Sequence, residues 1–341
     1  MNAEPHKILT IGGGSGQYVL LSGLRDLRGI DITSVVSMVD NGGSTGRLRD
    51  ELGILPPGDA LKCIVALSPF RDVAQKILLK RLNGDRRLKG HKAGNMLLTM
   101  LSRYTGNFPS AIKSLSEILE IQGRVLPGTT TKATLVAELA DGTRIYGESA
   151  IDIPQSLQRE QIKDLFLVPH YSNSITVYPP VIEAIDDSDY ILIGPGDLFT
   201  SIIATLIVPG IKEAIQNTKA KILYILNIMT KFGETHNYKS HDFVRMIEYY
   251  LERPVDGIIC NVRKPKKSLL ERYMNAKAEF VDVDKSEKWI GHRMLYTGDL
   301  VDTSDEIVRH APEKLASLIK SIIFNDNTDT KSFLTFKSQV V

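Results

Sequence analysis

Apolar segments rich in β-branched residues, each ending in glycines or polar residues, constrain this chain more than any other feature. The segments are KILTI (7–11), ITSVVSMVD (32–40), DYILI (189–193), KILYI (221–225) and GIICN (257–261). Their pattern is typical of buried strands. VLLSGLRDL (19–27) lies between the first two and carries apolar residues at helical spacing, so they form a βαβ unit with a right-handed crossover. The alternation predicts an α/β fold built on a mostly parallel sheet.

The middle of the chain departs from this alternation. Four segments between residues 59 and 121 have helical periodicity: DALKCIVALS, VAQKILLKRL, GNMLLTMLSRY and FPSAIKSLSEILEI. They predict a helical layer or a cap over the sheet. TKATLVAELADGTRIYGES then alternates around Asp141-Gly142, which predicts a β-hairpin. We therefore expect a helical cap plus β-hairpin insertion over about residues 60–175, and a flexible tail over 326–341.

Charge and cysteine content exclude several classes of protein. With 42 Lys+Arg against 40 Asp+Glu, the net charge is +2, so no global field attracts nucleic acid or an anionic membrane. The sequence has no run of about twenty apolar residues, the length that a membrane-spanning helix needs. We therefore expect a cytoplasmic protein. Cys63 and Cys260 lie in apolar surroundings without metal-site or redox spacing, which indicates reduced core thiols.

The first glycine loop, IGGGSGQYVLLSGL (11–24), joins the first strand to the first helix. Backbone N–H groups and the positive end of the helix dipole favour an anion there. Gln17 breaks the dinucleotide-binding fingerprint, and the chain lacks a Walker A lysine. The expected phosphate-binding residues are Gly13, Gly14, Ser15 and Gly16; a tight turn without a ligand is the alternative.

A second loop, DNGGSTGRLRDELGILPPGD (40–59), follows the second strand. Asp40 can bind hydroxyls or a metal, while the glycines and Ser44 offer donors and Arg47 and Arg49 are cations. The alternative is a solvated turn in which Arg47 pairs with Asp50 or Glu51. Asp59 precedes an apolar run and could simply be a helix N-cap. The expected ligand-binding residues are Asp40, Asn41, Gly42, Gly43, Ser44 and Arg47.

Two further loops have the same character. GHKAGN (90–95) begins a helix with His91 and Asn95, and a structural histidine is the alternative for His91. GPGDLFTS (194–201) follows the strand DYILI with Gly194 and Gly196, and we expect it to point free backbone N–H groups at the sheet's carboxyl edge. Because it is the third of the glycine loops at a strand end, we call it the third glycine loop. Since the carboxyl ends of parallel strands meet at one edge of a sheet, the loops predict a long, phosphate-bearing ligand across that edge.

Seven segments, in order, resemble the gluconeogenesis factor (YvcK) family, within the 2-phospho-L-lactate transferase (CofD) superfamily. They are GGGSG, DNGGSTGRLRDELGILPPGD, LKGHKAGN, GRVLP, GPGDLFTSII, NIMTKFGET and RHAPEKLA. The resemblance implies a single Rossmann-like domain over residues 1–325, with helices on both faces of its sheet. It also implies a nucleotide-sugar ligand, UDP-N-acetylglucosamine or UDP-glucose, and a role in cell shape and peptidoglycan supply during gluconeogenic growth. A homodimer and a protein partner in cell-wall synthesis are compatible with that role.

The resemblance adds ligand-binding residues and also shows departures. It adds Asn227, Thr230, Tyr273 as a stacking surface for the base, and Arg309; a helix-packing role for Tyr273 stays open. Asp197 stands where the family usually has serine, Asn41 where it has a second acid, and RHAP replaces RHDP. An acid beside a phosphate requires a cation between them, so Asp197 is a candidate metal ligand and Mg²⁺ a candidate cofactor.

Two functions of different class follow. In the first, which we favour, the protein is a nucleotide-sugar sensor that catalyses nothing. In the second, it is a Mg²⁺-dependent transferase acting on a nucleoside diphosphate, with Asp40 and Asp59 holding the metal or orienting the acceptor.

Overall fold

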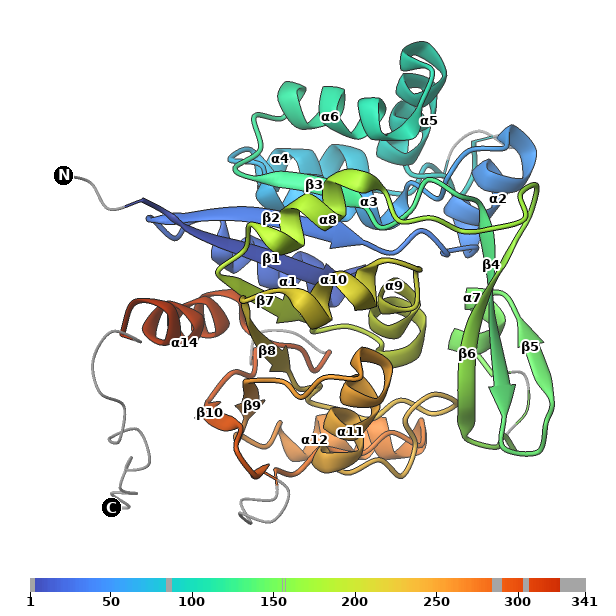
Figure 1. Ribbon diagram of the computed structural model, residues 1–341. Coiled ribbons are helices and arrows are strands. Elements are labelled where there is room, and N and C mark those ends of the chain that lie inside the picture. Colours follow the sequence, from blue (N-terminus) through green and yellow to red (C-terminus); the bar gives the residue numbers. More distant parts are fainter. Residues whose placement is uncertain are drawn as a thin grey trace.

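The computed structural model describes residues 4–83, 88–154, 156, 158–283, 290–302 and 307–325. Within these ranges a large sheet of seven strands forms the centre of the molecule (Figure 1), and every neighbouring pair of its strands is parallel. The predicted α/β class is confirmed. Across the sheet the order is β10 (Met294–Gly298), β9 (Gly257–Asn261), β8 (Lys221–Ile225), β7 (Tyr190–Ile193), β1 (His6–Gly12), β2 (Ile30–Val36) and β3 (Arg124–Pro127).

The strand order reverses between β1 and β7. From β1 the chain proceeds outward through β2 to β3, then returns to β7 beside β1 and proceeds the other way to β10. Such a reversal leaves a crevice at the carboxyl ends of the two central strands, where open α/β sheets bind ligands.

Helices cover both faces of this sheet because successive strand residues point to opposite sides. Ile8 packs into one buried cluster and Leu9 into the other. The first face is covered by α1 (Gly14–Leu24), α3 (Gly58–Leu67), α4 (Arg71–Ala74), the π-helical turn η1 (Gln75–Leu79), α5 (Ala93–Thr105), α6 (Phe108–Ile118) and α14 (Pro312–Asn325). The second is covered by α8 (Pro179–Asp186), the π-helical segment η2 (Leu198–Ile203), α9 (Ala204–Leu206), α10 (Ile211–Asn217) and α11 (Ser240–Leu251).

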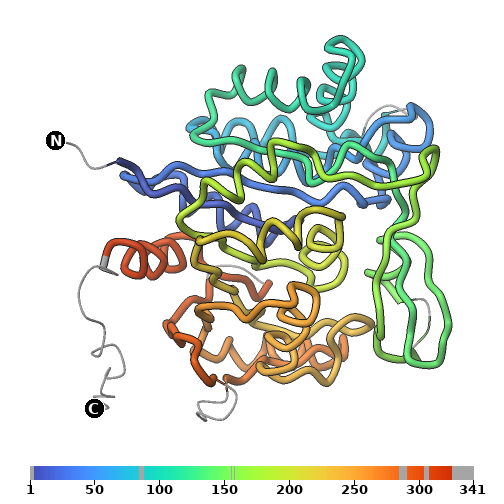
Figure 2. The backbone as a smooth tube through the Cα atoms, in the orientation of Figure 1, coloured from blue at the N-terminus to red at the C-terminus, as the bar shows by residue number. Residues whose placement is uncertain are grey.

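A second, antiparallel sheet stands at the carboxyl end of the large one (Figures 1 and 2). It contains β5 (Arg144–Tyr146), β4 (Ala133–Leu139) and β6 (Ile162–Pro169) in that order. β4 and β5 are the predicted hairpin, whose turn places Gly142 at φ +84°. The short helix α7 (Glu148–Asp152) follows β5. We call residues 133–169 the hairpin insertion.

The helices predicted between residues 59 and 121 are present and form a layer rather than a separate cap. Leu61, Ile64 and Leu98 are completely buried in the cluster that covers one face of the large sheet. Cys63 and Cys260 are buried free thiols, as expected. The expected flexible tail lies outside the described residues, and the single domain over residues 1–325 stays a prediction.

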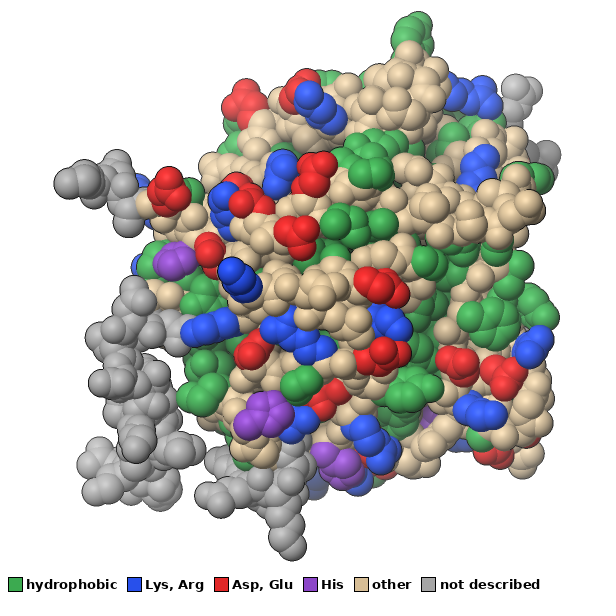
Figure 3. Space-filling model, viewed as in Figure 1, with side chains coloured by type: hydrophobic (Ala, Val, Ile, Leu, Met, Phe, Trp, Pro, Cys, Tyr) green, Lys and Arg blue, Asp and Glu red, His purple; other side chains and the backbone are tan. Residues whose placement is uncertain are grey.

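The visible surface mixes charges of both signs (Figure 3), consistent with the near-neutral net charge. Among the described helices, none alone is long and apolar enough to cross a membrane; one pair, Leu198–Leu206 with Ile211–Asn217, meets that test only together and is bent by 72°.

Candidate functional site

The first and third glycine loops contact each other where the strand order reverses. A Cβ atom at Gly16 would lie 2.3 Å from the carbonyl oxygen of Pro195, and one at Gly196 would lie 3.5 Å from that of Gly13. Asn227, just after β8, donates from Nδ2 to the carbonyl oxygen of Gly196 at 2.8 Å. The loops after β1, β7 and β8 therefore form one continuous surface, and glycine is required where their backbones touch.

The N-terminus of α1 is open to an anion. The helix begins at Gly14 after Gly13 as N-cap, no side chain caps it, and its first turn has no acidic residue. Gly14 adopts φ +64°, which favours glycine. Gln17, the residue that breaks the dinucleotide fingerprint, is buried and donates from Nε2 to Ser34 Oγ at 3.1 Å. It ties α1 to the sheet, while the N–H groups before it remain available to a phosphate.

The third loop differs because the protein supplies its own anion there. The backbone N–H groups of Phe199 and Thr200 donate to Glu234 Oε2 at 3.1 and 3.3 Å, and Thr200 Oγ1 donates to Glu234 Oε1 at 3.2 Å. The expectation that the start of this helical segment offers free N–H groups is therefore wrong. Gly194 and Gly196 remain predicted ligand residues.

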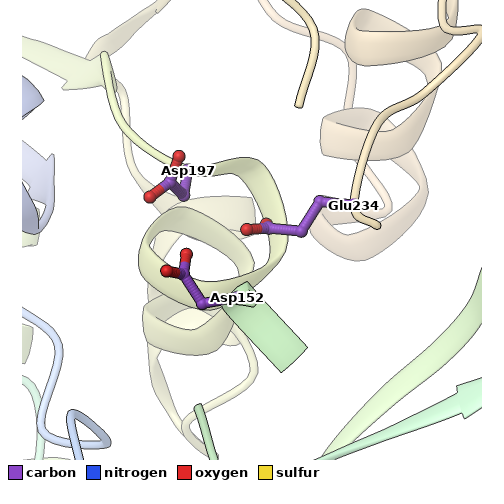
Figure 4. Close-up of side chains that lie close together, drawn as sticks. All are labelled: Asp152, Asp197 and Glu234. Carbon is purple, nitrogen blue, oxygen red and sulfur yellow. The ribbon is translucent and has the colours of Figure 1, made fainter. Parts of the chain in front are cut away.

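Asp197 lies in a cluster of three carboxylates (Figure 4), and one ammonium, that of Lys231, pairs with all three. Oxygens of Asp152, Asp197 and Glu234 lie within 4.8 Å of one another, a spacing that could hold a metal ion. Lys231 Nζ is 3.0 Å from Asp197, 3.2 Å from Glu234 and also paired with Asp152. The cation that Asp197 requires is thus present as a side chain, and a metal would compete with Lys231 for the same oxygens.

Burial and charge oppose each other in this cluster. Burial alone would lower the pKa of Lys231, but Glu234, Asp197 and Asp152 together hold that pKa above its ordinary value. Burial, and then the charge of Asp197, raise the pKa of Glu234, while Lys231 lowers it. Glu234 therefore depends on Lys231 to stay ionised.

The second glycine loop brings two carboxylates to the first loop. A Cβ atom at Gly13 would lie 2.5 Å from Asp59 Oδ2, and one at Gly58 would lie 2.9 Å from Asp40 Oδ2. Lys62 Nζ pairs with Asp59 Oδ1 at 3.0 Å. Burial, and then repulsion by Asp59, raise the pKa of Asp40. These two acids beside an open helix start are suited to holding a divalent ion.

The N-cap interpretation of Asp59 is wrong. α3 begins at Gly58, its N-cap is Pro57, and no side chain caps it. Asp59 lies inside the first turn, where its carboxylate faces the dipole and points at Gly13.

Ser44, His91 and Asn95 form a buried hydrogen-bonded group. Ser44 Oγ lies 3.1 Å from His91 Nδ1, and Asn95 Nδ2 donates to Ser44 Oγ at 3.3 Å. Burial, and then Arg47, lower the pKa of His91. Arg47 is exposed and donates to the carbonyl oxygen of Lys89 at 2.9 Å, while Arg49 rather than Arg47 pairs with Asp50. Arg47 is thus anchored beside the His91 loop.

The hairpin insertion reaches this site, which the sequence did not predict. Ser149 N donates to Asn41 Oδ1 at 2.8 Å, and a Cβ atom at Gly42 would lie 4.0 Å from Glu148 Oε2. Burial, and then Asp40 and Asp152, raise the pKa of Glu148 to about 8. Four charged residues near this edge of the sheet were not predicted from the sequence: Glu148, Asp152, Lys231 and Glu234. The Lys-x-x-Glu spacing of residues 231–234 was the one local signal of an ion pair.

The remaining expected residues lie along β8 to β10. Thr230 is buried, and its Oγ1 accepts from Glu279 N at 2.8 Å. Tyr273, on α12 (Lys267–Asn275), accepts at Oη from Val308 N at 3.1 Å. Tyr273 and the segment carrying Arg309 are therefore brought together, whereas their contact with a base or phosphate stays a prediction.

A parallel α/β sheet with an uncapped helix start and paired carboxylates at its switch point defines the Rossmann-like class of α/β proteins, in which ligands bind at such a switch point. Comparison with known proteins gives the family. The family model of 2-phospho-L-lactate transferase CofD matches residues 8–298. The gluconeogenesis factor of Bacillus subtilis is 37% identical over 325 residues, which are 95% of this chain and 99% of that protein. The gluconeogenesis factor of Listeria innocua is 35% identical over 324 residues, 95% of this chain and 97% of that protein.

A solved structure has the same fold. Protein BH3568 from Bacillus halodurans superposes with a TM-score of 0.86 at 34% identity, covering 93% of this chain and 100% of that one. The chain belongs to the CofD family and, within it, to the gluconeogenesis factors.

Proposed function

We propose that this protein binds a nucleotide-sugar, UDP-N-acetylglucosamine or UDP-glucose, across the carboxyl edge of its large sheet and acts as a regulatory binding protein. One observation carries the proposal: the start of α1 is uncapped and lies against Gly196 at the point where the strand order reverses. A diphosphate placed there receives N–H groups and the helix dipole.

The flanking residues give the ligand a direction. Tyr273 and the segment carrying Arg309 lie together toward β8 to β10, where an aromatic ring and a guanidinium suit a base and a phosphate. Asp40, Asp59 and Glu148 lie toward β2, where carboxylates suit sugar hydroxyls or a metal. The nucleoside then points toward β10 and the sugar toward the hairpin insertion.

The charges favour a magnesium complex of the ligand. Asp40 and Asp59 lie beside the proposed diphosphate position, and Lys62 pairs with Asp59. Two acids and a diphosphate repel unless a divalent ion joins them. Asp40 fits that role better than Asp197, because Lys231 already pairs with Asp197, whereas Asp40 forms no ion pair among the described residues.

The family supports a regulatory role. Relatives from Bacillus subtilis and Listeria innocua are named gluconeogenesis factors. In our proposal the bound nucleotide-sugar reports precursor supply to a protein partner in cell-wall synthesis, and so supports cell shape and peptidoglycan supply during gluconeogenic growth.

Calorimetric titration tests binding. We expect saturable binding of UDP-N-acetylglucosamine or UDP-glucose, weakened by EDTA and weakened again in Asp40→Asn. GDP-mannose is the matched nucleotide-sugar control. No binding of either UDP-sugar with Mg²⁺ present would refute the proposal.

Transferase activity is the second candidate, favoured by the Asp40–Asp59 pair beside the first loop and by the description of the family model. In that reaction an acceptor hydroxyl loses its proton to water and attacks the phosphorus distal to the nucleoside. The bond from that phosphorus to the bridging oxygen breaks, and a nucleoside monophosphate leaves. Release of UMP that requires Mg²⁺ and disappears in Asp40→Asn would establish turnover and reject the sensor.

A further inference from the structure

Helix α7 brings Glu148 to the second glycine loop. Ser149 N donates to Asn41 Oδ1 at 2.8 Å, which fixes the start of the helix against that loop. Gly147 is buried at φ +94°, and a Cβ atom there would lie 2.4 Å from Asn41 Nδ2. Asp152, at the other end of α7, pairs with Lys231. Both ends of the helix are therefore attached to the carboxyl edge of the large sheet, and Glu148 is held between them.

The carboxylates form a chain of neighbours in which Asp59 lies near Asp40 and Asp40 lies near Glu148. Asp59 lies next to Gly13, Asp40 next to Gly58, and Glu148 on the far side of Gly42, where a Cβ atom would lie 3.3 Å from Asp40 Oδ1 and 4.0 Å from Glu148 Oε2. If a diphosphate rests on the start of α1, the group beyond Asp40 in this direction is the sugar. This step rests on the proposed function.

Glu148 has acceptor capacity to spare. Among the described residues its carboxylate receives one hydrogen bond, from Ser149 Oγ at 3.2 Å, and forms no ion pair. A carboxyl group keeps acceptor positions whether or not it carries a proton, so Glu148 has unused ones in either state. By contrast, Asp59 pairs with Lys62, and Asp197 pairs with Lys231.

We propose that Glu148 of the hairpin insertion accepts hydrogen bonds from hydroxyl groups of the ligand's sugar, and so distinguishes a nucleotide-sugar from the bare nucleotide. Glycine at position 42 keeps the region between Asp40 and Glu148 free of a side chain, so that a hydroxyl can lie there. A Cβ atom at this position would also lie 2.9 Å from Ser149 Oγ. The insertion then serves as the sugar-reading part of the site.

The test compares UDP-N-acetylglucosamine with UDP, titrated in Mg²⁺ into four proteins: wild type, Glu148→Ala, Glu148→Gln and Glu160→Ala. Glu160 is an exposed acid of the same insertion, and Glu160→Ala controls for removing an acidic side chain from it. We expect Glu148→Ala to weaken the binding of UDP-N-acetylglucosamine about ten- to a hundredfold and to leave the affinity for UDP unchanged. Glu148→Gln should keep part of the sugar contribution, since its amide oxygen still accepts.

Three outcomes overturn the proposal in distinguishable ways. An unchanged ratio of the two affinities in folded Glu148→Ala shows that Glu148 does not read the sugar. An equal loss for UDP and UDP-N-acetylglucosamine, matched by a lower melting temperature, assigns Glu148 to holding the insertion in place. Failure of the wild type to bind either ligand removes the proposed function itself. If Glu148→Ala does not fold, Glu148→Gln with an unchanged ratio gives the same refutation.

Discussion

Replacing Lys231 by methionine tests the carboxylate cluster. Methionine keeps an unbranched, flexible side chain but removes the ammonium that pairs with Asp152, Asp197 and Glu234. The side chain of Glu234 is only 1% exposed, whereas that of Asp197 is 44% exposed and can be hydrated. Removing one partner of a buried ion pair costs about 3–5 kcal/mol. Because Lys231 is itself 32% exposed, we expect the lower end, about 3 kcal/mol.

The loss should depend on pH. Lys231 lowers the pKa of Glu234, so its removal moves that pKa further above the value of an unfolded glutamate. A group whose pKa is raised by folding makes the protein less stable as pH rises, because the unfolded state releases the proton at a lower pH than the folded state does. At pH 6 Glu234 in the variant takes up a proton and the loss is smaller; at pH 8.5 it is larger.

Thermal and urea unfolding at both pH values measure this effect. At about 2.1 cal/mol/K per residue, a loss of 3 kcal/mol lowers the melting temperature of a chain this long by roughly 4 °C. The control is Lys212→Met, which removes an exposed pair with Glu252 and should cost under about 1 kcal/mol. A loss in Lys231→Met no greater than that of the control, or equal at pH 6 and pH 8.5, refutes the reasoning.

Two further predictions concern the segment before α14. Arg309→Ala should weaken nucleotide-sugar binding about ten- to a hundredfold, or 1.5–3 kcal/mol, and Arg309→Lys should recover part because an ammonium lacks the planar fork; wild-type affinity in Arg309→Ala would leave the ligand on the glycine loops alone. Burial lowers the pKa of His310 to about 4, so the unfolded state binds a proton that the folded state does not, and stability should fall by about 3 kcal/mol as pH drops from 7 to 4. In His310→Gln the free energy of unfolding, measured by urea unfolding between pH 7 and pH 4, should fall less steeply. An unchanged fall would assign the acid sensitivity to other groups.

The central strands were predictable because each carries its own pattern. β1, β2, β7, β8 and β9 are buried apolar runs, and the Asp141-Gly142 turn identifies its hairpin without reference to the rest of the fold. β3 and β10 were not predicted. They lie at the two edges of the large sheet, and β3 has only four residues. Their strand conformation comes from pairing with a neighbour rather than from a local pattern.

The candidate site, like the fold, was predictable only where a local sequence pattern exists. Position after a strand end was enough to bring the first, second and third glycine loops to one edge. The partners of their charges were not predictable, because Lys231 and Asp152 are 79 residues apart and Phe199 and Glu234 are 35 apart. The Lys231–Asp152 pair joins the hairpin insertion to the loop after β8, and the Phe199–Glu234 contact joins the segments after β7 and β8; no spacing in the sequence encodes either contact.

The contrast between the starts of α1 and η2 has a consequence for the ligand's polarity. The two starts lie on either side of the β1–β7 crevice, yet only the start of α1 is free of a side-chain cap, since Glu234 accepts from the N–H groups of Phe199 and Thr200 at the start of η2. Glu234 is in effect a built-in competitor, covalently tethered and therefore present at very high effective concentration. If a diphosphate binds in the crevice as we propose, it meets one helix start with an uncapped end and one whose N–H groups are already occupied, so the ligand is expected to lie in a single direction. A single residue, far from either glycine loop in the sequence, thus makes the two helix starts unequal.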